Sequence, residues 1–140
     1  MLEIVCGEDF LFSANDSFTC TLFWRTEEGD FPADGWTDFA GVVLKWWTDA
    51  YFCLVYSTAA EFLFMDGPCR IRAVREGKNV RLSFLRDDRQ ALPDQIIGME
   101  EVRSALLKAA RRLKSGLAAE GKKEKAAMTD GVIERLKRTE

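Results

Sequence analysis

The sequence predicts an α+β fold in which a mainly antiparallel sheet of about six strands is packed by a long central helix and a C-terminal amphipathic helix. Three observations predict it. Residues 17–24 alternate in polarity with the period of two that marks a strand. Residues 60–86 hold three strand-like segments separated by turn residues, and residues 99–118 carry apolar side chains at helical spacing. The predicted element order is β-β-β-α-β-β-β-α, within the size of one ordinary domain.

The N-terminal region predicts three strands and a loop. Residues 2–6 and 10–13 are short apolar runs separated by the turn-like sequence GED. In residues 17–24, aromatic and β-branched side chains alternate between two faces, which favours a strand. The sequence RTEEGDFPADG that follows is polar and contains glycine and proline, so it predicts a loop.

Residues 37–57 are compatible with a helix or with a hairpin. Apolar side chains recur there at three- and four-residue steps, and Thr37 or Asp34 is available to cap a helix start. The hairpin interpretation places strands in VVLKWW and YFCLVYS around the turn TDA. Because TDA lacks the glycine or asparagine that tight hairpins prefer, we expect one long helix, largely buried against the sheet.

An antiparallel meander is predicted after this helix, with strands at residues 60–66, 69–75 and 80–86. Its turns contain glycine, proline and asparagine, which supply the backbone angles of tight reversals. The sequence DDRQALPDQ that follows is interpreted as a connection to the helix at residues 99–118.

The C-terminal region combines that amphipathic helix with a charged end. Glu100 and Glu101 lie in the first turn of the helix, where acidic side chains favour the helix dipole. The sequence AAEGKKEKAAMTDG predicts a linker or a frayed helix, and the last nine residues predict a short helix. We therefore assign residues 1–120 to a single α+β domain and residues 121–140 to a charged C-terminal tail or short helix.

Charge is distributed unevenly along the 140 residues, whose formal net charge is −3. Residues 1–66 contain twelve acidic and two basic residues, a net charge of −10, and residues 67–140 contain eighteen basic and eleven acidic residues, a net charge of +7. Such halves predict a surface with an acidic side and a basic side. The alternative is that the two halves interleave in space and cancel.

Several classes of chemistry are excluded by composition. The chain contains no histidine, which excludes Ser-His-Asp and Cys-His nucleophiles and any metal site that needs imidazole. The four cysteines are scattered without close pairs, which favours inert thiols over a zinc site. Phosphate-binding glycine motifs are also absent from the sequence, so we expect no cofactor and no metal.

The sequence predicts a cytoplasmic protein with reduced thiols. The first ten residues lack a basic region followed by a long apolar run, so no signal peptide is expected. No run of about eighteen apolar residues free of charge occurs, so no membrane span is expected.

The best candidate site is the acidic loop at residues 27–38, where aromatic side chains stand among carboxylates. Protein interfaces use such aromatic anchors, which are desolvated in a pocket while charges steer the approach. The alternative is that its two aromatic rings pack into the core at the helix start. The residues predicted to bind a partner are Glu27, Glu28, Asp30, Phe31, Asp34, Trp36 and Asp38.

Two other features invite a functional interpretation. Trp46 and Trp47 are adjacent, so on a helix they lie about 100° apart, and we expect one in the core and the other at a boundary. Arg70, Arg72 and Arg81 could align on neighbouring strands as a basic patch. Nucleic-acid binding is disfavoured, because the aromatic residues lie mostly in the acidic half and the net charge is negative.

The sequence FPADGWTDFAGVVLKWW, followed by FLFMDGPCRIRAV, has a proline before Trp-x-Asp-Phe, a long helix containing tryptophan, and a strand ending in Asp-Gly-Pro. Over residues 30–86 this pattern resembles small uncharacterised bacterial proteins and is similar to the immunity-type proteins that neutralise bacterial toxins. The resemblance implies a bacterial origin and a protein-binding role, and it carries over no catalytic residue.

The sequence therefore predicts a non-enzymatic protein-interaction module, in its concrete form an immunity-like inhibitor that binds a basic partner through an acidic surface. The partner is a protein, and a homodimer is a further possibility. The alternative is a small-ligand-binding protein or a carboxylate-dependent enzyme with a pocket between the long helix and the sheet. That pocket would be lined by Trp24, Trp36, Trp46 and Tyr51.

Overall fold

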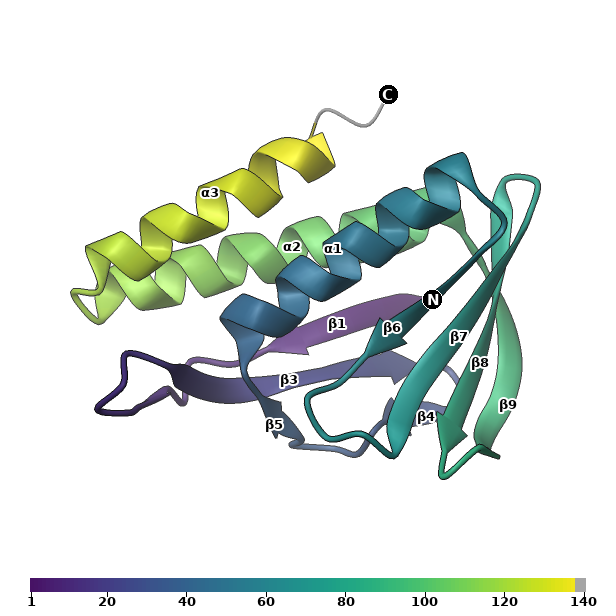
Figure 1. Ribbon diagram of the computed structural model, residues 1–140, viewed down its shortest axis with the longest axis horizontal. Coiled ribbons are helices and arrows are strands. Elements are labelled where there is room, and N and C mark those ends of the chain that lie inside the picture. The colour runs from purple at the N-terminus through teal and green to yellow at the C-terminus, as the bar shows by residue number, and fades with distance from the viewer. Residues whose placement is uncertain (138–140) are drawn as a thin grey trace.

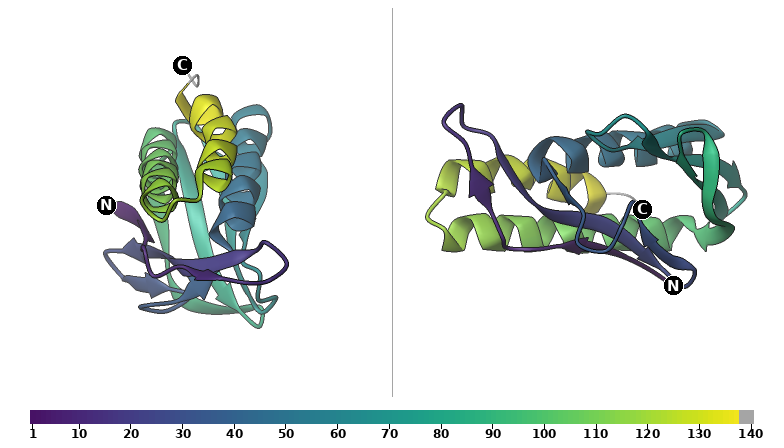
Figure 2. Two further views of the ribbon diagram at one scale, coloured as in Figure 1. Left: turned by 90° about the vertical axis from the view of Figure 1, so that its left-hand side faces the viewer. Right: turned by 90° about the horizontal axis from the view of Figure 1, so that it is seen from below.

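The computed structural model describes residues 1–137 and has the α+β architecture that the sequence predicts. Three helices lie together on one side of the antiparallel strands (Figure 1). Views from two further directions agree with this layered arrangement (Figure 2). The strands form one five-stranded and one four-stranded sheet, where a single sheet was expected.

The five-stranded sheet is organised around β3 (Phe18–Thr26), with which all its other strands pair. These are β1 (Leu2–Cys6), β2 (Leu11–Phe12), β4 (Gly29–Phe31) and β5 (Thr37–Asp38). The segment expected to be a loop after β3 instead folds back on it, since Trp24 is opposite Phe31 and Thr26 is opposite Gly29. This hairpin was hidden because its turn, Glu27-Glu28, contains no turn-forming residue type.

The four-stranded sheet is an antiparallel meander in the order β6-β7-β8-β9. Strands β6 (Ala59–Leu63), β7 (Cys69–Glu76) and β8 (Asn79–Arg86) confirm the three strands predicted there. The prediction of a connection after them was wrong, because Arg89–Gly98 forms a long fourth strand, β9.

Two features concealed β9 in the sequence. Its hairpin turn consists of Asp87 and Asp88, which adopt φ angles of 52° and 62° without the glycine that usually marks such a turn. Within the strand, Pro93 lies where the register with β8 shifts between the pairs that contain Leu92 and Gln95. Because β9 is an edge strand and proline is tolerated at edges and bulges, Pro93 does not end it.

The long helix expected at residues 37–57 is confirmed as α1 (Ala40–Tyr56). The expected cap was wrong: Phe39 is the N-cap residue, with no side-chain capping bond, and Thr37 instead belongs to β5. Among the described residues, no helix is both long and apolar enough to cross a membrane.

The predicted amphipathic helix is confirmed as α2 (Met99–Ala119). The helix ends at a glycine, Gly121, which has a φ angle of 77°. The N–H of Gly121 donates a hydrogen bond to the carbonyl of Ala118, and the N–H of Lys122 donates one to the carbonyl of Leu117. The chain then forms a third helix, α3 (Lys123–Lys137), where a linker or frayed helix was expected. The last three residues of the predicted terminal helix lie outside the described residues.

One continuous apolar core joins the two sheets and the helices. Trp47 of α1 packs against Trp24 of β3, with ring centroids 5.5 Å apart, and against Phe64 beyond β6 at 5.3 Å. Helix α3 contributes a buried face of Ala126, Thr129, Val132, Ile133 and Leu136. The C-terminal helix is therefore part of the packing that builds the surface described below.

Three of the four thiols are buried, as expected for inert cysteines, and Cys53 on α1 is exposed. Hydrogen bonding with Cys6 and burial both raise the pKa of the Cys20 thiol. A raised pKa keeps Cys20 protonated and unreactive.

Candidate functional site

The acidic loop does not present its seven predicted residues on one surface. Glu27, Glu28 and Asp34 are exposed, Asp30 and Trp36 are half-buried, and Phe31 and Asp38 are buried.

Phe31 and Asp38 must be removed from the predicted partner-binding set, because they are only 1% and 3% exposed. The Phe31 ring packs edge-on against Phe84, at 5.4 Å, which confirms the alternative of core packing for this ring. Asp38 accepts hydrogen bonds from the backbone N–H of Phe39 at 2.8 Å, and from Trp36 Nε1 and the N–H of Met65 at 3.2 Å. Its carboxylate therefore ties the start of α1 to the end of β6.

Most of the remaining acidic side chains in the loop are already matched by positive charge. Glu27 accepts a 2.7 Å hydrogen bond from the amino group of Met1, which lowers the pKa of Glu27. Arg25 contacts Asp30 at 3.1 Å and Asp34 at 3.6 Å. Among residues 1–137, Glu28 has no ion pair, so the loop offers far less unmatched negative charge than its sequence suggests.

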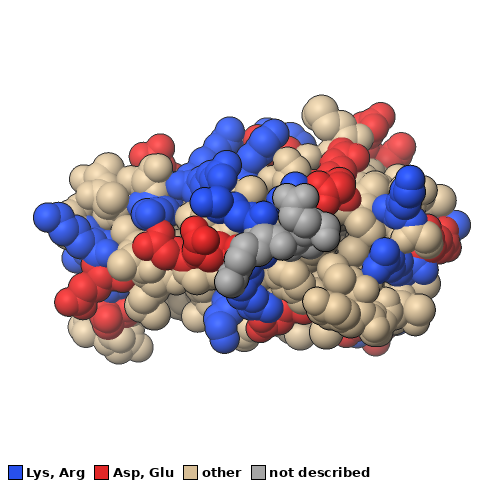
Figure 3. All heavy atoms as spheres, turned by 90° about the horizontal axis from the view of Figure 1, so that it is seen from above, with Lys and Arg blue, Asp and Glu red and all other residues tan. Residues whose placement is uncertain are grey.

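The acidic and basic halves of the chain also interleave elsewhere. At least four acidic residues from the first half pair with bases from the second: Glu3 with Arg112, Asp16 with Lys125, Asp49 with Arg135, and Glu61 with Arg70. On the helical face, side chains of both signs are intermixed (Figure 3). The structure therefore favours the interleaved alternative over separate acidic and basic sides.

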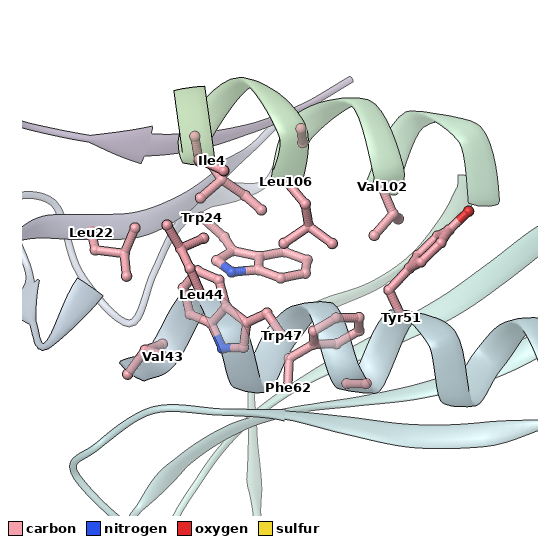
Figure 4. Packing of buried hydrophobic residues seen from close by; sticks show 14 of the residues in the cluster. Ile4, Leu22, Trp24, Val43, Leu44, Trp47, Tyr51, Phe62, Val102 and Leu106 are labelled. Carbon is pink, nitrogen blue, oxygen red and sulfur yellow. The ribbon is translucent and has the colours of Figure 1, made fainter. Parts of the chain in front are cut away.

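The residues of the pocket predicted between helix and sheet are not brought together. Trp24 and Tyr51 are 0% and 2% exposed and lie within closely packed apolar side chains (Figure 4). Trp47, which was not part of that set, fills the space and donates a hydrogen bond from Nε1 to the carbonyl of Leu63 at 2.7 Å. Trp46 lies on another side of α1, as the 100° offset of adjacent helical residues requires.

A groove of about 460 Å³ lies between α1 and α3, and Trp46 lines it. One wall is the first half of α1 and the other is α3 from Lys125 to Val132, while the end of α2 contributes Leu113 and Leu117. The turn before β3 contributes Asp16 and Ser17 to the lining, and the first residue of β3 contributes Phe18.

The groove exists because α3 packs mainly on α2 and reaches α1 less closely. Ion pairs between described residues connect α3 to other elements on this side. Lys125 pairs with Asp16 at one end of the groove, which lowers the pKa of the Asp16 carboxyl group. Further along the two helices, Arg135 contacts Asp49 of α1 at 2.7 Å.

Three apolar side chains that line the groove remain open to solvent. Val42 and Trp46 on α1 are 46% and 37% exposed, and Met128 on α3 is 80% exposed. Lys45, also on α1, lines the groove and makes no ion pair with any described residue. The surface is therefore apolar with a basic rim, and the only carboxylate among its described lining residues, Asp16, is engaged by Lys125.

The sequence did not predict this groove, because it indicated a linker or frayed helix before residue 132 and only a short helix after it, whereas one continuous helix forms the wall. The Trp46-Trp47 pair was the available signal, and it indicated that one ring would lie at a boundary. A scan of protein-family models gives no match for this chain, and searches of curated proteins and of solved structures give no significant match.

Proposed function

We propose that this chain is a non-enzymatic protein-interaction module that binds its partner through the groove between α1 and α3. The observation that carries the proposal is the exposure of Val42, Trp46 and Met128 around one concavity. Scattered exposed apolar residues are common, but apolar side chains gathered in a groove mark interaction sites.

The types of side chain support binding to a macromolecule. Tryptophan is enriched among the residues that dominate interface energies, since its ring buries a large area at little entropic cost. Methionine is flexible and polarisable, and it adapts to the shape of a partner. Trp46 and Met128 supply these two properties from opposite walls.

The groove is poorly equipped for acid–base chemistry. The chain has no histidine, and the Asp16 carboxylate is held by Lys125. General acid–base catalysis needs a group that can exchange a proton with a bound substrate at working pH. Binding of a partner requires no such proton exchange, so it is compatible with these residues.

The test is selection of a phage-displayed library of random peptides on the immobilised chain. We expect the selected peptides to lose affinity at least about tenfold with Trp46→Ala, because an anchor of this kind contributes more than 1.4 kcal/mol. Ile96→Ala is the matched control, since Ile96 is 54% exposed on β9 and does not line the groove. Equal losses for both variants, or no loss with Trp46→Ala, would contradict the groove as the binding site.

A narrower version keeps the immunity-like inhibitor, in which the acidic loop attracts a basic toxin domain. Glu27, Glu28 and Asp34 are the exposed carboxylates of this loop, and of these only Glu28 has no ion pair within residues 1–137. Affinity for such a domain should then fall between about 0.1 M and about 1 M salt and fall further with Asp34→Lys. If the affinity is unchanged by salt and by Asp34→Lys, this electrostatic version is wrong, whereas the groove proposal is not affected.

A small apolar ligand is the second candidate, because about 460 Å³ is within the size range of ligand pockets. It predicts that a library of apolar small molecules contains compounds that raise the melting temperature of the wild type and leave that of Trp46→Ala unchanged. If no compound behaves in this way, the small-ligand alternative is wrong.

A further inference from the structure

We propose that the occupant of the α1–α3 groove is an amphipathic helix of a partner protein that carries acidic side chains beside its apolar face. This inference rests on the proposed function, because it names the class of partner for the same groove.

The spacing of the wall residues favours a helical occupant. Val42 and Trp46 are four residues apart on α1, and Met128 and Val132 are four residues apart on α3, and all four line the groove. Residues four apart form a ridge along a helix, so each wall carries one such ridge. On α3 the exposed part of the ridge is Met128, because Val132 is only 9% exposed. A third helix packs between two ridges of this kind by inserting a ridge of its own, as amphipathic helices do in helix-in-groove recognition.

The length of the apolar wall sets the part of the helix that is bound. The lining of α3 runs from Lys125 to Val132, a rise of about 10 Å or about two helical turns. Apolar side chains at positions i, i+3 or i+4, and i+7 of the occupant cover about two turns. Two turns of the occupant therefore match the length of this wall, and the remaining faces of the occupant stay in solvent.

The charge of the rim favours an acidic occupant. Lys45 lies on α1 between Val42 and Trp46 and has no ion-pair partner within residues 1–137, so its charge is available to a ligand. The second lysine of the lining, Lys125, is paired with Asp16, and no carboxylate in the described lining is left to attract a basic segment. A carboxylate one turn along the occupant from its apolar residues would complement Lys45.

This preference is opposite to the one expected from the sequence. The acidic loop suggests a basic partner, whereas the rim of the groove repels one. The two surfaces therefore make different predictions about the same partner, and a peptide of known charge distinguishes them.

The experiment uses two synthetic peptides of about sixteen residues that share one helical pattern of leucines. The flanking positions carry glutamate in one peptide and lysine in the other, and each peptide bears a fluorophore for anisotropy titration against the full chain. We expect the glutamate peptide to bind at least about tenfold more tightly than the lysine peptide, a difference of about 1.4 kcal/mol. Lys45→Glu should reverse this preference, and Trp46→Ala should weaken both peptides.

Two controls separate a specific contact from general electrostatics. Lys78→Glu makes the same charge change at an exposed position outside the groove, in the turn between β7 and β8, and should leave the preference intact. A third peptide has the glutamate composition with prolines placed between the leucines, so that it cannot form a helix. This proline peptide should bind at least about tenfold more weakly than the glutamate peptide without proline.

Each outcome decides the inference. Equal binding of the two charged peptides, a preference that survives Lys45→Glu, or tight binding of the proline peptide would overturn it. Library peptides that require Trp46 but are basic or rich in proline would overturn this inference and leave the proposed function intact. If neither the library nor the designed peptides depend on Trp46, the proposed function itself is wrong.

Discussion

The two faces of α1 make the most informative comparison in this protein, because adjacent tryptophans mark them. Trp47 is 0% exposed and packs between Trp24 and Phe64, where strands and helices close around it. Trp46, one residue earlier, is 37% exposed beside α3. The same residue type is therefore part of the core on one face and partly open to solvent on the other.

The difference arises from what covers each face. Core side chains from β3 and from the C-terminal end of β6 pack around the Trp47 face, and the Trp47 indole N–H donates a hydrogen bond to the carbonyl of Leu63. On the other face, α3 is a single helix that packs mainly on α2 and leaves a groove beside α1. A sheet can cover a helix face continuously, whereas two helices meet along one line and leave space beside it.

The largest expected effect comes from breaking the closed face. Trp47→Ala should lower the free energy of unfolding by about 3–5 kcal/mol, because it leaves a cavity and removes a buried hydrogen bond. Trp46→Ala should lower it by less than about 1 kcal/mol, because that ring is partly solvated already. Urea denaturation of both variants measures the difference. Similar losses would show that the two faces of α1 contribute equally to stability.

The acidic loop gives a second comparison of the same kind. Asp38→Ala should cost about 2–4 kcal/mol, because the N–H groups of Trp36, Phe39 and Met65 lose a charged acceptor. Asp34→Ala should change stability by no more than about 0.5 kcal/mol, since the carboxylate is exposed. Thermal unfolding of both variants tests this difference in stability. Asp38→Asn keeps one acceptor oxygen, so its loss of stability should lie between those of the two alanine variants. A stable Asp38→Ala protein would contradict the role assigned to this carboxylate.

Helix α3 can be strengthened without touching either tryptophan. Gly131 lies in the interior of α3, and an added Cβ there would meet no atom within 4 Å. Gly131→Ala should therefore raise the free energy of unfolding by about 1 kcal/mol, the difference in helix propensity between the two residues. Gly121→Ala is the opposed control, because its φ of 77° strains any other residue and the variant should be less stable. Chemical denaturation that shows no gain for Gly131→Ala would contradict this account of α3.

The smallest expected effect concerns the ion pair at the end of the groove. The hydrogen bond from Lys125 lowers the pKa of Asp16, so the folded state binds this proton less tightly than the unfolded state does. Stability from this pair is present above the ordinary carboxyl pKa and is lost as the pH falls through the lowered value, below about pH 4.

Melting temperatures of the wild type and Asp16→Asn should therefore differ slightly near neutral pH and converge in acid. Glu124→Gln is the matched control, since it removes an exposed carboxylate from the first turn of α3 that makes no ion pair with a described residue. A constant difference between wild type and Asp16→Asn at all pH values would show that the pair does not contribute to folding.

Local periodicity alone was enough to predict a large part of the fold. The absence of a turn residue in TDA distinguished one helix from a hairpin at α1, and alternating apolar residues with glycine turns located β6, β7 and β8. Those signals depend only on side chains a few residues apart, so they can be read from the chain. Strand β9 was missed because its turn uses two aspartates and its proline lies at a shift in register, both of which depend on pairing with β8.

The candidate site depended on longer distances. The sequence by itself determined that one of Trp46 and Trp47 would be buried, since helical geometry separates them, and that histidine chemistry was excluded. Only the tertiary structure decided which tryptophan stayed open, which acidic residues were neutralised by distant bases, and where α3 lay. Those outcomes depend on contacts such as Asp16–Lys125, whose partners are separated by 109 positions in the chain, and no local pattern records such a contact.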